Sequence, residues 1–116
     1  VALLVRQFFM DSKFWSGHCN KDYHFCNTFT PSGVLVKAIL LHSGQAMTRF
    51  NGRPNSSPLD APPDSTQGYG RVTLSNVLPL SGVYNFDLFV EDLTRITQNS
   101  QWTYHAVVGS SSKPLK

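Results

Sequence analysis

Residues 31–47 read PSGVLVKAILLHSGQAM, and they form the most informative part of the sequence. Its spread of apolar side chains predicts a helix over about residues 31–42. Thr30 offers a side-chain oxygen as the N-cap, and Pro31 suits the first helical position, where its missing N–H costs nothing. Gly44 can take the left-handed conformation that closes a helix. The broad apolar surface of this helix consists of Val34, Leu35, Ala38, Ile39 and Leu41.

The start of the chain predicts a second helix. Its apolar residues follow the i, i+3, i+4, i+7, i+8 spacing that gives a helix one apolar face. They are Val1, Leu4, Val5, Phe8 and Phe9. We expect this helix to end near residues 10–13.

Residues 49–67 change composition abruptly and predict a surface loop. The segment interleaves four prolines with Asn, Ser and Asp, which neither a helix nor a central strand tolerates. The prolines are Pro54, Pro58, Pro62 and Pro63.

The residues after this loop predict a tight turn and a short strand. Gly68 and Gly70 flank Tyr69, a pattern suited to a close backbone approach and unusual dihedral angles. Val72 and Leu74 then alternate as in a short strand, and residues 76–79 can make one turn.

The C-terminal third changes from helical to strand periodicity. Apolar residues alternate with polar ones in two segments joined by a polar connection over residues 92–100. We expect two half-buried strands, whose inward residues are Phe86, Leu88 and Val90 in one and Trp102, Tyr104, Ala106 and Val108 in the other. The change predicts a domain boundary near Leu80, between residues 1–80 and residues 81–116.

Charge and hydropathy exclude two classes of partner. The net charge is +3, only 15% of residues are charged, and the ten basic residues are scattered, so we expect no nucleic-acid binding. No apolar run approaches the roughly 20 residues that span a bilayer. The first residues lack the basic leader and cleavage site of a signal peptide.

Cys19 and Cys26 lie in one short polar and aromatic loop. A local disulfide is the favoured interpretation, and it predicts an oxidising, secreted or lumenal compartment. With His18 and His24 the cysteines also offer four zinc ligands, but structural zinc sites usually join two separated ligand pairs. Zinc and free thiols remain the alternatives.

Three further groups of residues were considered as sites. His42 and Ser43 are adjacent, but neighbours on a helix point about 100° apart, so an ordinary helix-end pair is favoured over a nucleophile and its base. The acidic residues Asp11, Asp22, Asp60 and Asp64 match no defined calcium loop, and solvated turn aspartates are the favoured interpretation. The triplet that begins at Asn55 is an acceptable glycosylation sequon.

Aromatic residues suggest a sugar-stacking platform as an alternative role. Trp15 with Phe14 and Tyr23 is one candidate platform, and Trp102 with Tyr104 is another. For the second pair, packing into a sandwich core is favoured, because alternating strand aromatics more often lie inside.

Residues 31–47 and the later QGYGRV of residues 67–72 together resemble the end of a subtilisin-like serine protease (subtilase, peptidase S8) domain. In that family, a late helix that begins at a proline is followed by a loop and a glycine-flanked aromatic residue. Residues 1–9 resemble the remainder of the helix that follows the family's Gly-Thr-Ser-Met-type nucleophile turn.

The resemblance implies an α/β fold. Residues 1–80 would be the C-terminal part of a subtilisin-like catalytic domain, with two helices and a short terminal strand. Residues 81–116 would be the first antiparallel strands of a following β-sandwich domain, truncated. The chain opens inside an apolar run and closes on KPLK, so we expect a fragment.

The resemblance also implies a function. The parent protein would be a serine endopeptidase acting on proteins or peptides, with its Ser/His/Asp triad upstream of this chain. This chain would hold no catalytic residue and no cofactor, and it would need the missing N-terminal segment to fold. Subtilases often bind calcium at loops, so the parent is a candidate for that ion. The rival interpretation is a secreted, non-catalytic β-rich module that binds carbohydrate through Trp15, Tyr23 and Trp102.

Overall fold

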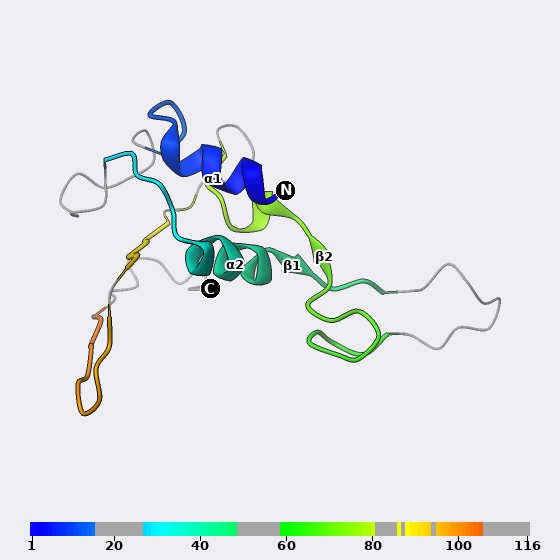
Figure 1. Ribbon diagram of the computed structural model, residues 1–116. Coiled ribbons are helices and arrows are strands. Elements are labelled where there is room, and N and C mark those ends of the chain that lie inside the picture. Colours follow the sequence, from blue (N-terminus) through cyan, green and yellow to red (C-terminus); the bar gives the residue numbers. More distant parts are fainter. Residues whose placement is uncertain (16–26, 49–58, 81–85, 87, 94, 106–116) are drawn as a thin grey trace.

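A computed structural model describes residues 1–15, 27–48, 59–80, 86, 88–93 and 95–105 of the 116. Two helices come first, and a two-stranded antiparallel sheet and a short 3₁₀ helix follow them (Figure 1). Their bounds are α1 Ala2–Met10, α2 Gly33–His42, β1 Gly44–Gln45, β2 Arg71–Val72 and η1 Leu74–Asn76. The described residues therefore have mixed helix and strand content, and the assignment to a subtilase stays a prediction.

Helix α1 forms where the apolar spacing predicts, and its buried residues follow the i, i+3, i+4 spacing of one face. Val5, Phe8 and Phe9 are buried, whereas Val1 and Leu4 are exposed. The helix ends because Asp11 has extended dihedral angles, φ −102° and ψ 120°. The described residues therefore cover one face of α1 and leave the apolar residues of its first turn exposed.

Helix α2 begins two residues later than expected, so the prediction of Thr30 as N-cap is wrong. Ser32 is the N-cap: it has extended dihedral angles, and its hydroxyl accepts a hydrogen bond of 3.1 Å from the amide of Leu35. Pro31 is buried and precedes the cap instead of occupying the first helical position.

The C-terminus of α2 also differs from expectation. The C-cap Ser43 keeps a right-handed conformation, with φ −74° and ψ −4°. Gly44 is not among the residues with positive φ; it begins strand β1. Gly44 therefore serves a close approach to another segment and not a left-handed helix end.

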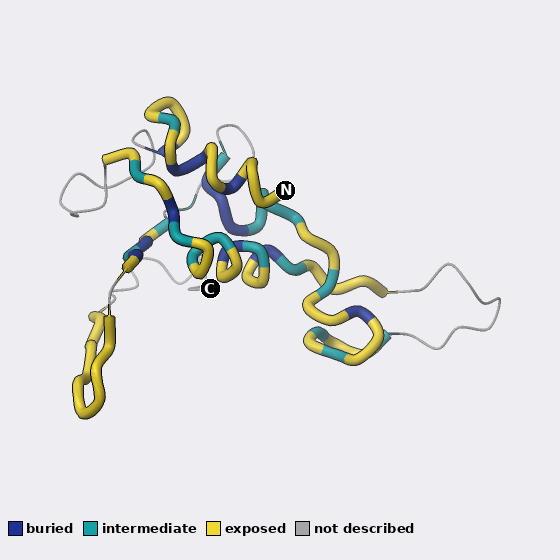
Figure 2. The backbone as a smooth tube through the Cα atoms, viewed as in Figure 1, coloured by how far each residue is buried: buried dark blue, intermediate teal, exposed yellow. Residues whose placement is uncertain are grey.

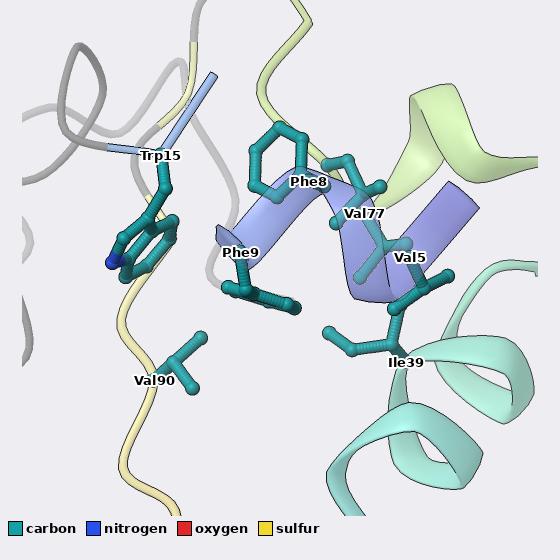
Figure 3. Packing of buried hydrophobic residues seen from close by; sticks show 8 residues of the cluster. Val5, Phe8, Phe9, Trp15, Ile39, Val77 and Val90 are labelled. Carbon is teal, nitrogen blue, oxygen red and sulfur yellow. The ribbon is translucent and has the colours of Figure 1, made fainter. Parts of the chain in front are cut away.

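The hydrophobic core gathers around the end of α1. The rings of Phe9 and Trp15 meet edge to face, with centroids 4.9 Å apart, and those of Phe9 and Phe29 lie 5.2 Å apart. Figure 3 shows Val77 beside Phe8 and Val90 across from Phe9. The buried members of this core are Val5, Phe8, Phe9, Trp15, Ile39, Val77, Leu78 and Val90. Helices, the segment after η1 and the C-terminal segment thus share one core.

Strands β1 and β2 join the end of α2 to the segment after the loop. Gly44 pairs with Val72 and Gln45 with Arg71 in antiparallel register. The expected strand stops at Val72, because Leu74 begins η1 and its carbonyl accepts the amides of the two residues that follow the helix. The turn expected over residues 76–79 therefore lies slightly earlier.

Residues 95–105 form an exposed arm that extends away from the helices (Figures 1 and 2). Neither this arm nor residues 88–93 are assigned as strand. Trp102 and Tyr104, which we expected to be half-buried, are 51% and 59% exposed. The alternating pattern therefore does not bury these two rings in the described part of the chain.

The boundary expected near Leu80 stays a prediction, but one described residue beyond it belongs to the core around α1. Val90 is buried in the same cluster as Phe9 and Trp15, and Leu88 packs against it. A β-sandwich built from residues 81–116 stays a prediction. Among the described residues, no helix is long and apolar enough to cross a membrane.

Candidate functional site

The junction between the end of α2 and the Gly-Tyr-Gly turn is the first candidate site. A Cβ atom on Gly44 would lie 2.0 Å from the carbonyl oxygen of Tyr69, and one on Gly70 would lie 2.3 Å from the carbonyl oxygen of Gln45. Gly70 also has φ +86°, a conformation that side chains disfavour. The two segments approach so closely that both positions require glycine.

Gln67 fastens this junction to the neighbouring loop. Its side chain is buried; its Oε1 accepts from the amide of Met47 at 2.8 Å, and its Nε2 donates to the carbonyl of Asp60. Three segments are thus joined by one amide side chain. A buried amide with both ends bonded stabilises one arrangement of the turn.

Asp64 organises the turn before Tyr69. Its Oδ1 accepts from the amides of Thr66 and Gln67, and its backbone bonds in both directions with Gly68. The Thr66 amide, followed by that of Gln67, lowers the pKa of the Asp64 carboxyl below its ordinary value. Its Oδ2 is buried without a hydrogen-bond partner in the described part of the chain.

His42 and Ser43 form no nucleophile and base pair. Ser43 is fully buried, and its hydroxyl donates to the carbonyl of Leu40 at 2.8 Å. Its own carbonyl accepts the amide of Thr73. His42 is exposed. Ser43 is therefore a structural residue that ties the end of α2 to the segment after β2.

A second polar site lies at the opposite end of α2, where Asp92 meets Ser32. The Asp92 carboxylate accepts from the Ser32 amide at 2.7 Å and from the Ser32 hydroxyl at 2.6 Å. It also accepts from the amide of Leu93 at 2.9 Å. Asp92 is only 9% exposed, so this is a buried carboxylate at a helix N-terminus.

Two opposing effects set the ionisation of Asp92. Burial disfavours the charged form, but the hydrogen bonds from the Ser32 hydroxyl, the Ser32 amide and the Leu93 amide outweigh it. The pKa of Asp92 is consequently held below its ordinary value. The carboxylate is thus a stabilising anion at neutral pH.

The aspartates considered as calcium candidates are not brought together in the described residues. Asp11 accepts the amide of Lys13 at 2.9 Å, Asp60 is exposed and Asp64 is engaged in its own turn. The described segments contain no group of three metal-ligating side chains. Several predicted residues lie outside the described residues: His18, Cys19, Asp22, Tyr23, His24, Cys26 and Asn55.

The aromatic candidates separate into a buried and an exposed set. Trp15 is 1% exposed, so its predicted role in a sugar-stacking platform is wrong. Trp102 and Tyr104 are exposed on the arm. The Tyr104 hydroxyl donates to Glu91 at 2.6 Å, which raises the pKa of Tyr104 above its ordinary value, and its ring meets Phe89 edge to face.

Three polar residues of these sites were not singled out from the sequence: Ser32, Gln67 and Asp92. Asp92 continues the alternation of Leu88 and Val90, and this spacing was a usable signal that it faces inward. Ser32 lies three residues before Leu35, and an N-cap side chain accepts the amide of a residue at this spacing. Nothing in the local pattern distinguishes Gln67 as buried.

Comparisons with known proteins add no family to this geometry. No family model, no curated protein and no solved structure matches the chain. Function is therefore inferred from the sites themselves and from the sequence.

Proposed function

We propose that this chain is the C-terminal scaffold of a subtilisin-like serine endopeptidase. One observation carries the proposal. The two segments that resemble the family, residues 31–47 and 67–72, lie far apart in sequence but pair as β1 and β2, with glycines at both points of closest approach. A resemblance carried by two separate segments is better support for the proposal when the two segments pack directly against each other.

The exposed apolar residues of both helices support the same proposal. Leu3 and Val34 are each 80% exposed, and Leu4 is 58% exposed. Exposed apolar side chains on helices that otherwise pack well indicate that another protein segment covers them. The catalytic domain's parallel sheet would supply that surface, and this explains why the chain would need its N-terminal segment to fold.

In the proposed enzyme this chain supports the catalytic groups without containing one. Helix α1 would be the remainder of the helix that follows the nucleophile turn, and the N-terminus of that longer helix would favour the negative charge that develops beside the serine. The core around Phe9 and Ile39 fixes α1 against α2 and so would hold that turn in place. The buried, bonded Ser43 takes no part in the chemistry.

The first test is the sequence upstream of Val1 in the encoding gene. We expect a Gly-Thr-Ser-Met-like turn within about ten residues before it. The longer protein should then be labelled by a fluorophosphonate at the serine of that turn. Labelling should persist in Ser43→Ala and vanish when the upstream serine is replaced. A start codon or signal sequence in place of the turn would refute the proposal.

A secreted carbohydrate-binding module is the second candidate, favoured by one observation. Trp102 and Tyr104 are both more than half exposed on the arm, and exposed aromatic rings suit stacking on sugars. Oligosaccharide titration should then quench the fluorescence of Trp102 and leave that of buried Trp15 unchanged. If neither the wild type nor Trp102→Ala binds the oligosaccharide, the carbohydrate-binding candidate is refuted and only the protease proposal remains.

A further inference from the structure

Residues 88–93 form an extended segment with two different faces. Burial alternates along it: Val90 and Asp92 are 7% and 9% exposed, whereas Phe89 and Leu93 are 55% and 83% exposed. Leu88 also packs against the core. A period of two in burial is that of an extended chain with one face against the protein.

The inward face is fastened at two points. Val90 is inserted into the aromatic core near Phe9 and Trp15, as Figure 3 shows. Asp92 accepts the amide and the hydroxyl of Ser32, which lies 60 positions earlier in the sequence. One contact is apolar and the other is charge-assisted, so together they fix both the position and the register of the segment.

The Asp92 contact extends into helix α2. The amide of Leu35 donates to the Ser32 hydroxyl, and that hydroxyl donates to Asp92. Each bond in this series orients the next, because a hydroxyl that donates to a carboxylate presents its lone pairs to the amide. Asp92 therefore acts on the N-cap of α2 as well as on its own segment.

The outward face meets the exposed arm. Phe89 contacts the ring of Tyr104, and Glu91 accepts its hydroxyl at 2.6 Å. Leu93, which follows the Asp92 contact, has φ +64°, and the chain leaves the core there. The same six residues thus touch the helices on one side and the arm on the other.

We propose that residues 88–93 are a strap that fastens the arm, residues 95–105, to the start of α2, with the Asp92–Ser32 contact as its clasp. Opening the clasp frees the strap, the arm and the N-cap together. Loosening the outward contacts frees the arm alone. The proposal does not depend on the protease assignment, because every contact lies within this chain.

The test compares two adjacent charge-removing substitutions, Asp92→Asn and Glu91→Gln, in the full-length protein. Amide hydrogen exchange is followed at millisecond to minute times with residue resolution. In Asp92→Asn we expect the amides of Ser32, Leu35 and Leu93 to exchange about tenfold faster or more, as the loss of a charge-assisted hydrogen bond predicts. In Glu91→Gln these three amides should keep wild-type rates.

Limited chymotrypsin digestion supplies the second readout. Cleavage after Trp102 or Tyr104 should accelerate in both variants, whereas cleavage after Phe89 should accelerate only in Asp92→Asn. Ser32→Thr keeps the hydroxyl and should retain protection of the Leu93 amide. Ser32→Ala should lose it, and its effect with Asp92→Asn should be less than the sum of the two.

Three results would overturn the strap. They are equal effects of the two charge-removing substitutions on α2, additive effects of Ser32→Ala and Asp92→Asn, and a wild-type chain whose Ser32 and Leu93 amides show no protection. Each would mean that the Asp92–Ser32 contact does not couple the arm to the start of α2.

Discussion

The core at the end of α1 and the exposed arm are built from the same kind of side chain but differ in burial. Phe9 and Trp15 are at most 1% exposed, whereas Trp102 and Tyr104 are more than half exposed (Figure 2). In the core, rings from α1, its following turn and residue 29 surround one another. The arm meets the rest of the described chain mainly through Phe89 and Glu91.

This difference shows that a partner surface decides burial more than the residue type does. Burying an aromatic ring stabilises the folded chain, but only where other segments cover both faces of the ring.

The two tryptophans should give the strongest contrast. Trp15→Ala should cost about 3–5 kcal/mol in the free energy of unfolding, since it leaves a cavity among packed rings. Trp102→Ala should change it by less than about 0.5 kcal/mol. Urea unfolding followed by circular dichroism measures both. Equal losses would show that the arm packs in solution as tightly as the core.

The glycines of the junction should come next. Gly70→Ala should lower the free energy of unfolding by about 2 kcal/mol or more. The added Cβ would clash with the Gln45 carbonyl, and the residue would also keep a φ that side chains disfavour. Gly68→Ala has the positive φ but open space, and should cost about 1 kcal/mol.

Gly33→Ala is the matched control for these substitutions. It lies in α2 with nothing near its Cβ position, so it should stabilise the chain by about 0.5–1 kcal/mol. The same unfolding measurement orders the three variants. A tolerated Gly70→Ala would mean that β1 and β2 separate without cost.

Acid should weaken the attachment of the strap to the core. The pKa of Asp92 is lowered in the folded chain, so its stabilising contribution is present above its unfolded pKa and is lost as the pH falls through the folded pKa. Asp92→Asn should remove about 1.5 kcal/mol at neutral pH and flatten this part of the acid unfolding curve. Glu91→Gln is the matched control and should leave that part of the curve in place.

The smallest effect is expected at Tyr104 in the arm. Its hydrogen bond to Glu91 raises its pKa, so Glu91→Gln should move the titration of this tyrosine toward lower pH. Carbon-13 NMR of the tyrosine ring carbons follows each residue separately. An unchanged Tyr104 titration would show that the arm does not rest on the strap.

The sequence predicts the two helices well because their signals are local. The apolar spacing of α1 and the continuous apolar run of α2 suffice to locate them, and the Gly-Tyr-Gly pattern correctly predicts a close approach of the backbone. The N-cap was misplaced at Thr30 because several neighbouring residues can cap. The choice of Ser32 coincides with a bond to Asp92, which no local pattern contains.

The positions of the helices and of the required glycines can be predicted from local sequence, because propensity and periodicity act over a few residues. Which apolar residues are covered depends on tertiary contacts. The tertiary structure buries Trp15 and exposes Trp102, and it directs Asp92 to the N-cap of α2. These outcomes depend on segments far apart in the sequence, such as Ser32 and Asp92 at a separation of 60 positions, whose contacts form only when the whole chain is folded.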